Sequence, residues 1–244
     1  MGKTGKPKGL EGDEVVAWYL QAAEGGDAES QYLFGKMYQK GKGLDKDDAE
    51  AVKWYRKAAM QGYPAAQHRL AQMYETGSGV SRDLVEAVRW WNLAAEQGDV
   101  DAQCRMAEIY RDGTGMAANA SEAAKWYRKA ARQGGSEAQC CLAGMYRDGI
   151  GVDADLSEAA KWYRRAAKQG LAEAQYRLGE MYYQGHGVKQ NFSKAVKWLH
   201  RAAKHDHAHA KLLLAGMFEE KADKKHDAAK PKRKGQKSGK DKKS

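Results

Sequence analysis

The chain has 244 residues, of which 42% are hydrophobic and 30% charged, and its formal net charge is +10. Its mean hydropathy is −0.83. The longest aliphatic run, Leu212–Ala215, is far shorter than the roughly 20 apolar residues of a transmembrane helix. The composition therefore excludes a protein that spans a membrane with helices.

The positive charge is concentrated at the two ends of the chain. Residues 1–10 hold three lysines and no acid, and residues 221–244 hold 11 Lys and Arg against 3 Asp, whereas residues 11–220 hold 28 bases and 29 acids. No apolar stretch follows the N-terminal lysines, so we expect no signal peptide. We predict a disordered basic N-terminus over residues 1–12 and a cytoplasmic protein, or a nuclear one if its source is eukaryotic.

The rest of the chain repeats with a period of 36 residues, which is typical of repeat proteins whose units bury their apolar faces against each other. Paired glycines such as Gly41 and Gly43 recur at this spacing, as do alanine pairs and a glutamine. Tryptophan recurs too, and we assign these side chains a structural role in the core. They are Trp18, Trp54, Trp90, Trp126, Trp162 and Trp198.

In chain order, the first predicted helix, Asp13–Gly26, has the pattern of a second helix without its partner. The first complete repeat, Ala28–Tyr63, then contains a helix over Ala28–Lys40, a glycine stop at Gly41, and a helix over Asp48–Met60. Apolar residues recur at helical spacing in both segments. Glycine readily ends a helix, and acids before the second helix cap its N–H groups. Each repeat is therefore predicted to be an antiparallel helix pair.

The last predicted element is a first helix without its partner, starting at Ala208. Because Lys221 and Asp223 stand where the paired glycines would be, we expect this helix to continue to about Ala229. The prediction is an all-α solenoid over residues 13–220, with about five full repeats, a half repeat at each end and about twelve helices.

Three cysteines, Cys104, Cys140 and Cys141, fall in the repeats. Cys104 and Cys140 share one repeat position, so we expect free thiols that contribute to helix packing.

Four histidines cluster near one turn, at His200, His205, His207 and His209. No cysteine and no clear set of carboxylates accompanies them, so we favour a solvated cluster over a metal site.

The densest repeat pattern resembles a known family, the Sel-one-like repeat (SLR), a relative of the tetratricopeptide repeat. The matching residues of the fourth repeat are Gln139, Leu142, Met145, Tyr146, Gly149, Gly151, Val152, Glu158, Ala159, Trp162, Tyr163, Ala166, Ala167 and Gly170. The resemblance covers about residues 14–218. It departs at Ile109 in place of Met, at Trp91 and Leu199 in place of Tyr, and at Met116 in place of Val. It implies a right-handed α-α superhelix that acts as a scaffold or adaptor through protein–protein contacts.

First helices line the concave face in related solenoids, so we predict that their outward residues bind a protein or peptide partner. The candidates are Tyr32, Lys36, His68, Arg69, Gln72, Arg105, Glu108, Tyr176, Arg177, Glu180 and Tyr183. The alternative is ordinary solvation, with Arg105–Glu108 and Arg177–Glu180 as simple i,i+3 pairs. We found no catalytic constellation, and we predict a monomeric, non-enzymatic protein without cofactor or metal.

Two basic features leave an alternative function open. The second helices carry a basic ridge, for example Lys125, Arg128 and Lys129, which we attribute to the helix dipole rather than to polyanion binding. The Lys-rich segment 221–244 is predicted to be largely disordered. It is a solubilising tail, a targeting signal or an element that binds nucleic acid or an anionic surface, through Lys230, Lys232, Arg233 and Lys234.

Overall fold

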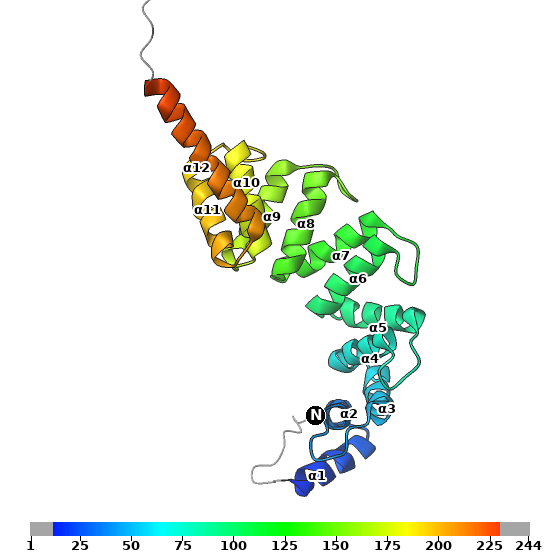
Figure 1. Cartoon of the computed structure of the whole chain (residues 1–244). Coiled ribbons are helices and arrows are strands. Elements are labelled where there is room, and N and C mark those ends of the chain that lie inside the picture. The colour runs from blue at the N-terminus through cyan, green and yellow to red at the C-terminus, as the bar shows by residue number, and fades with distance from the viewer. Residues whose placement is uncertain (1–11, 230–244) are drawn as a thin grey trace, which may run out of the picture.

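The computed structural model describes residues 12–229, in which twelve helices and no strand are found. The helices form antiparallel pairs stacked along an arc, and α12 extends beyond the end of the stack (Figure 1). Their bounds are α1 (Asp13–Glu24), α2 (Ala28–Lys40), α3 (Asp48–Met60), α4 (Pro64–Thr76), α5 (Leu84–Glu96), α6 (Val100–Asp112), α7 (Ala120–Arg132), α8 (Ser136–Asp148), α9 (Leu156–Lys168), α10 (Ala172–Gln184), α11 (Phe192–Lys204) and α12 (Ala208–Ala229). The prediction of an all-α repeat superhelix is confirmed.

Even-numbered helices are the first helices of their repeats, and odd-numbered helices are the second ones. Each second helix from α3 to α11 packs between the first helix of its own repeat and that of the next repeat, whereas α1 packs on α2. The predicted disorder of the N-terminus, and the tail residues Lys230, Lys232, Arg233 and Lys234, lie outside the described residues.

The helix ends follow the local signals in the sequence. Gly41 after α2 has φ 62° and ψ 38°, the left-handed conformation, and glycines end α4, α6, α8 and α10 in the same way. At the start of α3, the Asp47 carboxylate accepts hydrogen bonds from the N–H groups of Ala49 and Glu50, at 2.8 and 3.0 Å. These caps satisfy backbone groups that a helix leaves unpaired. The predicted bounds of the helix pair are therefore confirmed.

The second glycine of each pair has a different role, which is to let repeats approach each other. A Cβ atom on Gly151 would overlap the carbonyl oxygen of Ala120, at the start of the preceding second helix. Gly187 meets Leu156 in the same manner. Any larger residue would push the turn of one repeat away from the helix of the previous one.

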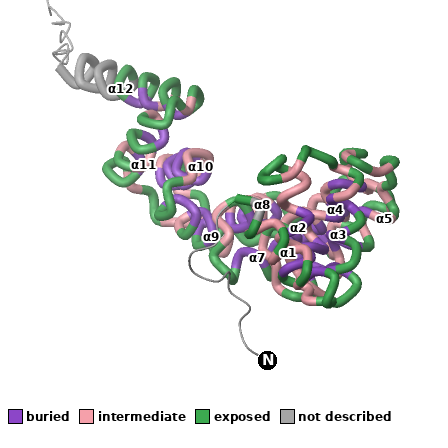
Figure 2. The backbone as a smooth tube through the Cα atoms, turned by 90° about the horizontal axis from the view of Figure 1, so that it is seen from below, coloured by how far each residue is buried: buried purple, intermediate pink, exposed green. Residues whose placement is uncertain are grey.

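The core runs the length of the array between the helices, while the loops are exposed (Figure 2). It is built largely from alanines and aromatic residues, with Tyr55 fully buried and Tyr127 2% exposed. Four of the periodic tryptophans are buried, whereas those in the terminal repeats, Trp18 and Trp198, are partly exposed. The structural role predicted for this set fits the four inner members best, because the terminal ones have fewer neighbours.

Buried glutamines form a ladder that joins successive repeats. The Gln103 side chain donates from Nε2 to the Ala95 carbonyl of the preceding second helix, at 3.0 Å. Its Oε1 accepts from Nε2 of Gln133, at the end of its own second helix, at 2.8 Å. The rungs of this glutamine ladder are the pairs Gln31–Gln61, Gln67–Gln97, Gln103–Gln133 and Gln139–Gln169. The period showed these glutamines, but their partners lie 30 residues away and were not predicted.

The basic ridge of the second helices is engaged in contacts within the array. Nη2 of Arg128 donates to the Tyr146 hydroxyl at 3.0 Å, which links α7 to α8. Nζ of Lys129 lies 3.7 Å from the centroid of the Trp126 ring, a cation–π contact. Equivalent contacts recur as Arg56–Tyr74, Arg164–Tyr182, Lys57–Trp54, Arg165–Trp162 and Arg201–Trp198. These contacts give the ridge a structural role within the array, besides the preference of bases for the ends of helices that explained it in the sequence.

Candidate protein-binding surface

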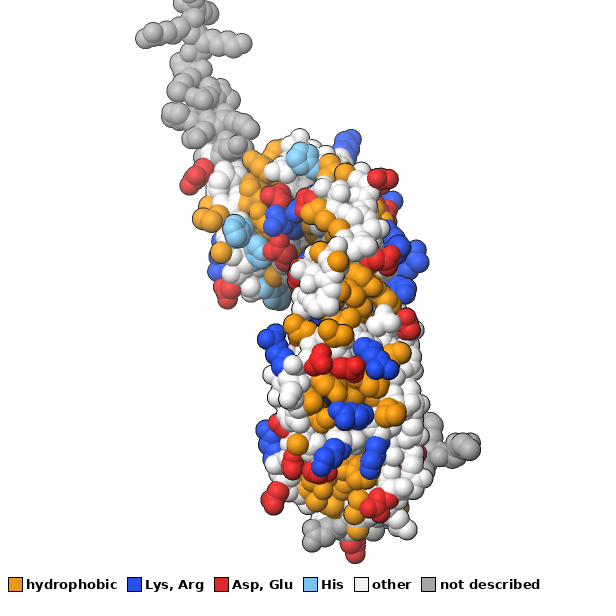
Figure 3. Space-filling model, turned by 90° about the vertical axis from the view of Figure 1, so that its right-hand side faces the viewer, with side chains coloured by type: hydrophobic (Ala, Val, Ile, Leu, Met, Phe, Trp, Pro, Cys, Tyr) orange, Lys and Arg blue, Asp and Glu red, His pale blue; other side chains and the backbone are white. Residues whose placement is uncertain are grey.

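The predicted site residues fall into three separate groups along the first helices. One face of the array shows acidic and basic side chains alternating with exposed hydrophobic ones, with histidines gathered toward the C-terminal end (Figure 3). The three groups lie at α2, at α4 and α6, and at α10 and α12.

The second group forms a hollow of about 590 Å³, which we call the central groove. Its lining includes His68, Gln72, Glu75, Cys104, Arg105 and Glu108. Four of the predicted residues therefore lie together, contributed by two successive repeats.

Arg105 is held in the central groove by two carboxylates. Its Nη1 donates to Oε2 of Glu108 at 2.7 Å, and its Nη2 donates to Glu75 of the preceding repeat. Glu75 also accepts from Nε1 of Trp91 at 3.1 Å. Burial lowers the pKa of Arg105, but the hydrogen bonds to the two carboxylates outweigh it and raise the pKa above its usual value. The pair with Glu108 was predicted, whereas Glu75 was missed because it lies 30 residues away.

His68 also lines the central groove. Its Nδ1 is 3.1 Å from Oδ2 of Asp99, and its ring packs edge-on against Trp91 at 4.8 Å. Asp99 also accepts the Ala102 N–H at 2.8 Å, which caps α6. Burial raises the pKa of Asp99, but its hydrogen bonds with His68 and with backbone N–H groups leave that pKa below its usual value. His68 therefore contacts a carboxylate that also fixes the start of the next repeat.

The first group, at α2, is a packed aromatic cluster rather than an open site. The Tyr32 ring lies 5.6 Å from that of Tyr55 and 5.3 Å from that of Tyr63. Nζ of Lys36 lies 5.9 Å from the centre of the Tyr32 ring.

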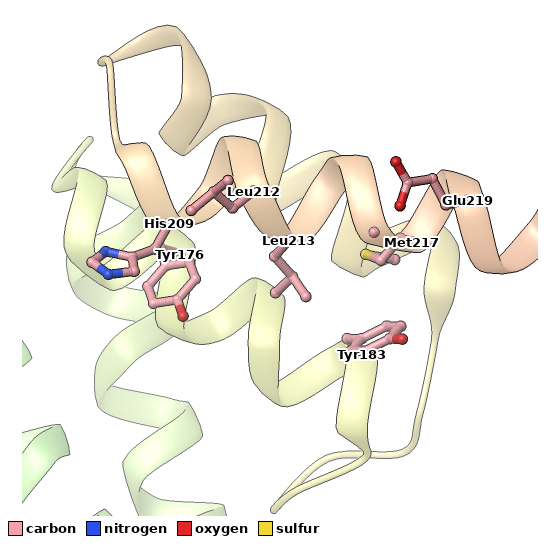
Figure 4. Close-up of a pocket in the computed structure, with 8 residues that line it drawn as sticks. Tyr176, Tyr183, His209, Leu212, Leu213, Met217 and Glu219 are labelled. Atoms are coloured by element: carbon pink, nitrogen blue, oxygen red, sulfur yellow. The ribbon is translucent and has the colours of Figure 1, made fainter.

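The third group borders a second hollow, of about 620 Å³, between α10 and α12, which we call the C-terminal groove. Tyr176, Tyr183, His209 and Leu213 line it (Figure 4). Tyr176 was expected to face outward, but its side chain is buried. The reason is α12, because His207 at its start stacks on the Tyr176 ring at 4.7 Å between centroids.

The interpretation of the histidines as solvated is wrong for His207, whereas His200, His205 and His209 are exposed as expected. Its Nε2 lies 2.8 Å from Oε2 of Glu173, and its Nδ1 accepts the Ala210 N–H at 3.3 Å. His207 therefore caps α12 and connects it to α10. Within residues 12–229 no group of three or more His, Cys, Asp or Glu is arranged to hold a metal ion.

Arg177 pairs within its own helix. Its Nε donates to Glu173 at 2.7 Å and its Nη1 to Glu180 at 3.3 Å. The predicted i,i+3 pair is present, with Glu173 as an additional partner that is shared with His207.

The three cysteines are free, as predicted. Burial is the main cause that raises the pKa of both Cys104 and Cys140 to about 12. These thiols are therefore protonated at neutral pH, which makes them poor nucleophiles.

No helix within residues 12–229 is long and apolar enough to span a membrane.

Comparison with known proteins identifies the repeat. The Sel1 repeat family model matches residues 16–27, 28–63, 64–99, 100–135, 136–171 and 172–207. No curated protein matches this chain.

Two solved structures are similar over most of this chain. A protective antigen of uropathogenic Escherichia coli strains, with an SLR fold, has a TM-score of 0.82 and 36% identity, over 87% of this chain and 45% of that one. A Sel1 repeat protein from Oxalobacter formigenes has a TM-score of 0.79 and 33% identity, over 84% of this chain and 85% of that one. The chain thus spans less than half of the Escherichia coli protein. On the repeat match and these similarities, the chain belongs to the Sel1 repeat family.

Proposed function

We propose that this protein is a non-enzymatic scaffold that binds a protein or peptide partner along its first helices, with the central groove as the main contact. Sel1 repeat proteins are in general scaffolds for protein–protein interaction. The observation that carries the proposal is the groove itself, a hollow of about 590 Å³ lined mainly by the repeats 64–99 and 100–135, with Gln39 and Glu137 from the repeats on either side.

The chemistry of the groove suits an extended polypeptide. Cys104, which is partly exposed, offers apolar surface, and Arg105, fixed by Glu75 and Glu108, offers a rigid polar centre. A side chain held by two partners loses little conformational freedom when a ligand binds, which favours affinity. Arginine is also among the residues that most often dominate binding energy at interfaces.

The test begins with proteins captured from lysate of the native cell, from which one partner is purified. Its Kd is then measured for the wild type, for Arg105→Ala, and for the control Arg89→Ala, which removes an exposed arginine paired with Glu86 on α5. We expect Arg105→Ala to weaken binding about tenfold or more and Arg89→Ala to leave it unchanged, with both variants folded by circular dichroism. Equal affinity of Arg105→Ala and wild type for every purified partner would refute the central groove as the contact.

The basic tail gives a second candidate function, which rests on sequence charge alone. Residues 230–244 follow the last turn of α12, so their deletion leaves all twelve described helices intact. If the tail binds nucleic acid, the deletion lowers affinity and flattens the dependence on salt. Wild-type protein that retains no nucleic acid at low salt would rule this function out.

A further inference from the structure

The helix α12 is a first helix that no second helix of residues 12–229 covers. In a complete repeat, the position nearest the second helix holds a small residue, because a Cβ atom on Gly35 would lie 3.0 Å from the Tyr55 ring. Alanines at the equivalent position are 0% exposed: Ala71, Ala107 and Ala143. Ala215 occupies this position in α12, and it is exposed.

The remaining apolar positions of α12 are also those of a covered helix. Leu214, Met217 and Phe218 stand where α10 has Leu178, Met181 and Tyr182. Leu214 and Met217 are buried against the array, but Phe218 is 52% exposed, whereas Tyr182 is 7% exposed. Thus α12 retains the sequence of a helix that receives a second helix, although none folds back onto it within residues 12–229.

The helix α1 shows the reciprocal arrangement. It has the pattern of a second helix, and Val16, Tyr19 and Leu20 pack on the hydrophobic cluster formed with α2 and α3. Val15 and Ala22 stand where other second helices have alanines that are 0% exposed against their own first helix, such as Ala51 and Ala58 in α3. In α1 both positions are only partly buried, as is Trp18.

From these observations we propose that α12 of one molecule binds α1 of a second copy of this chain and forms a complete repeat across the boundary. The contact is head-to-tail, so each molecule keeps one open end and the assembly grows with concentration. The apolar surfaces of Ala215 and Phe218 on one copy would be covered by Val15, Trp18 and Ala22 on the other. This proposal replaces the expectation of a monomer and is independent of the central groove.

The test uses the full chain and two complementary variants. Ala215→Glu blocks the α12 end and leaves α1 open, whereas Ala22→Glu blocks the α1 end and leaves α12 open. The control, Ala208→Glu, makes the same substitution at an exposed alanine in the first turn of α12. Sedimentation velocity is recorded for each protein, and for a 1:1 mixture of the two blocking variants, over a wide concentration range, with circular dichroism as the check of folding.

We expect the mass of the wild type and of Ala208→Glu to rise with concentration. Each blocking variant alone should associate about tenfold more weakly or not at all, because a glutamate would be buried against an apolar helix. Their mixture should form a 1:1 dimer and nothing larger, because it contains one open α12 and one open α1. If Ala22→Glu unfolds α1, Val15→Glu replaces it.

Three outcomes overturn the proposal. One is a wild type that stays monomeric at all concentrations, and another is a mixture that behaves as the sum of its components. The third is one blocking variant that associates as strongly as the wild type, which would mean that like ends pair with each other.

Discussion

The last rung of the glutamine ladder is incomplete, which yields a prediction that the protein can be stabilised. Nε2 of Gln175 donates to the Ala167 carbonyl at 3.2 Å, as the other ladder glutamines do. Its Oε1 is buried and has no hydrogen-bond partner within residues 12–229. The cause is His205, which stands where the inner repeats have the second glutamine, such as Gln169.

We predict that His205→Gln stabilises the C-terminal repeat. The new Nε2 group can donate to Gln175 Oε1, as Gln169 donates to Gln139 at 2.9 Å. A net hydrogen bond contributes about 1 kcal/mol, which corresponds to roughly 2–4 °C in Tm for a chain of this size. The converse change, Gln169→Ala, leaves the Gln139 acceptor buried and unpaired, and it should cost about 1–3 kcal/mol.

The assay is thermal unfolding together with amide hydrogen exchange of α10, α11 and α12. The matched control is His200→Gln, the same substitution at an exposed position of α11. Protection should increase in the three helices for His205→Gln alone. If both histidine variants unfold like the wild type, the unpaired Gln175 oxygen is not a source of instability and the reasoning is wrong.

Three further predictions concern the turns and the titrating groups. Asp206 has φ 57°, a left-handed conformation that the inner repeats give to a glycine. Because this conformation costs a residue with a Cβ atom about 1 kcal/mol, Asp206→Gly should raise the free energy of unfolding by about that amount. Denaturant titration measures it, and an unchanged midpoint would contradict the prediction. Burial raises the pKa of Glu173, but hydrogen bonds with His207 and Arg177 leave it lowered. The ionised Glu173 carboxylate therefore stabilises the folded state above the pKa of an unfolded Glu, and this stabilisation is lost as the pH falls through the lower pKa of the folded state. Amide hydrogen exchange should show that α12 loses protection in acid in the wild type. The loss should be smaller in His207→Ala, which lacks one of the two partners of Glu173. Cys104 and Cys140 should resist alkylation by iodoacetamide at pH 7 until the protein unfolds, as followed by mass spectrometry; rapid labelling of native protein would show that they are accessible thiolates.

The features that the sequence predicted well are those encoded locally. The glycine at the end of each first helix and the Asp or Asn before most second helices act within one turn, so the bounds of α2 and α3 were predicted to the residue. The continuation of α12 to Ala229 followed from the loss of the glycine pair, for the same reason.

The features that were missed depend on how one repeat sits on the next. Glu75 reaches Arg105 across 30 residues, and His207 covers Tyr176 across 31. Neither separation in sequence is one that brings residues together on a single helix. Both contacts exist only because the superhelix places consecutive first helices side by side. A period of 36 residues predicts which positions are equivalent, but it does not predict which different positions meet.

The two grooves occupy the same place in the repeat and carry different chemistry. His68 and Tyr176 are equivalent positions three repeats apart, and so are their partners Asp99 and His207. A histidine–carboxylate contact at one boundary thus becomes a ring stack at the other, in the same place of the repeat. Glu75 likewise becomes Tyr183, so the central groove is polar and charged where the C-terminal groove is aromatic. The repeating positions set the spacing of the grooves, and the positions that vary set what each one can bind. A single extended partner that contacts both grooves would therefore need charged groups for one and apolar groups for the other, and substitutions in one groove should weaken its binding without changing the contacts in the other.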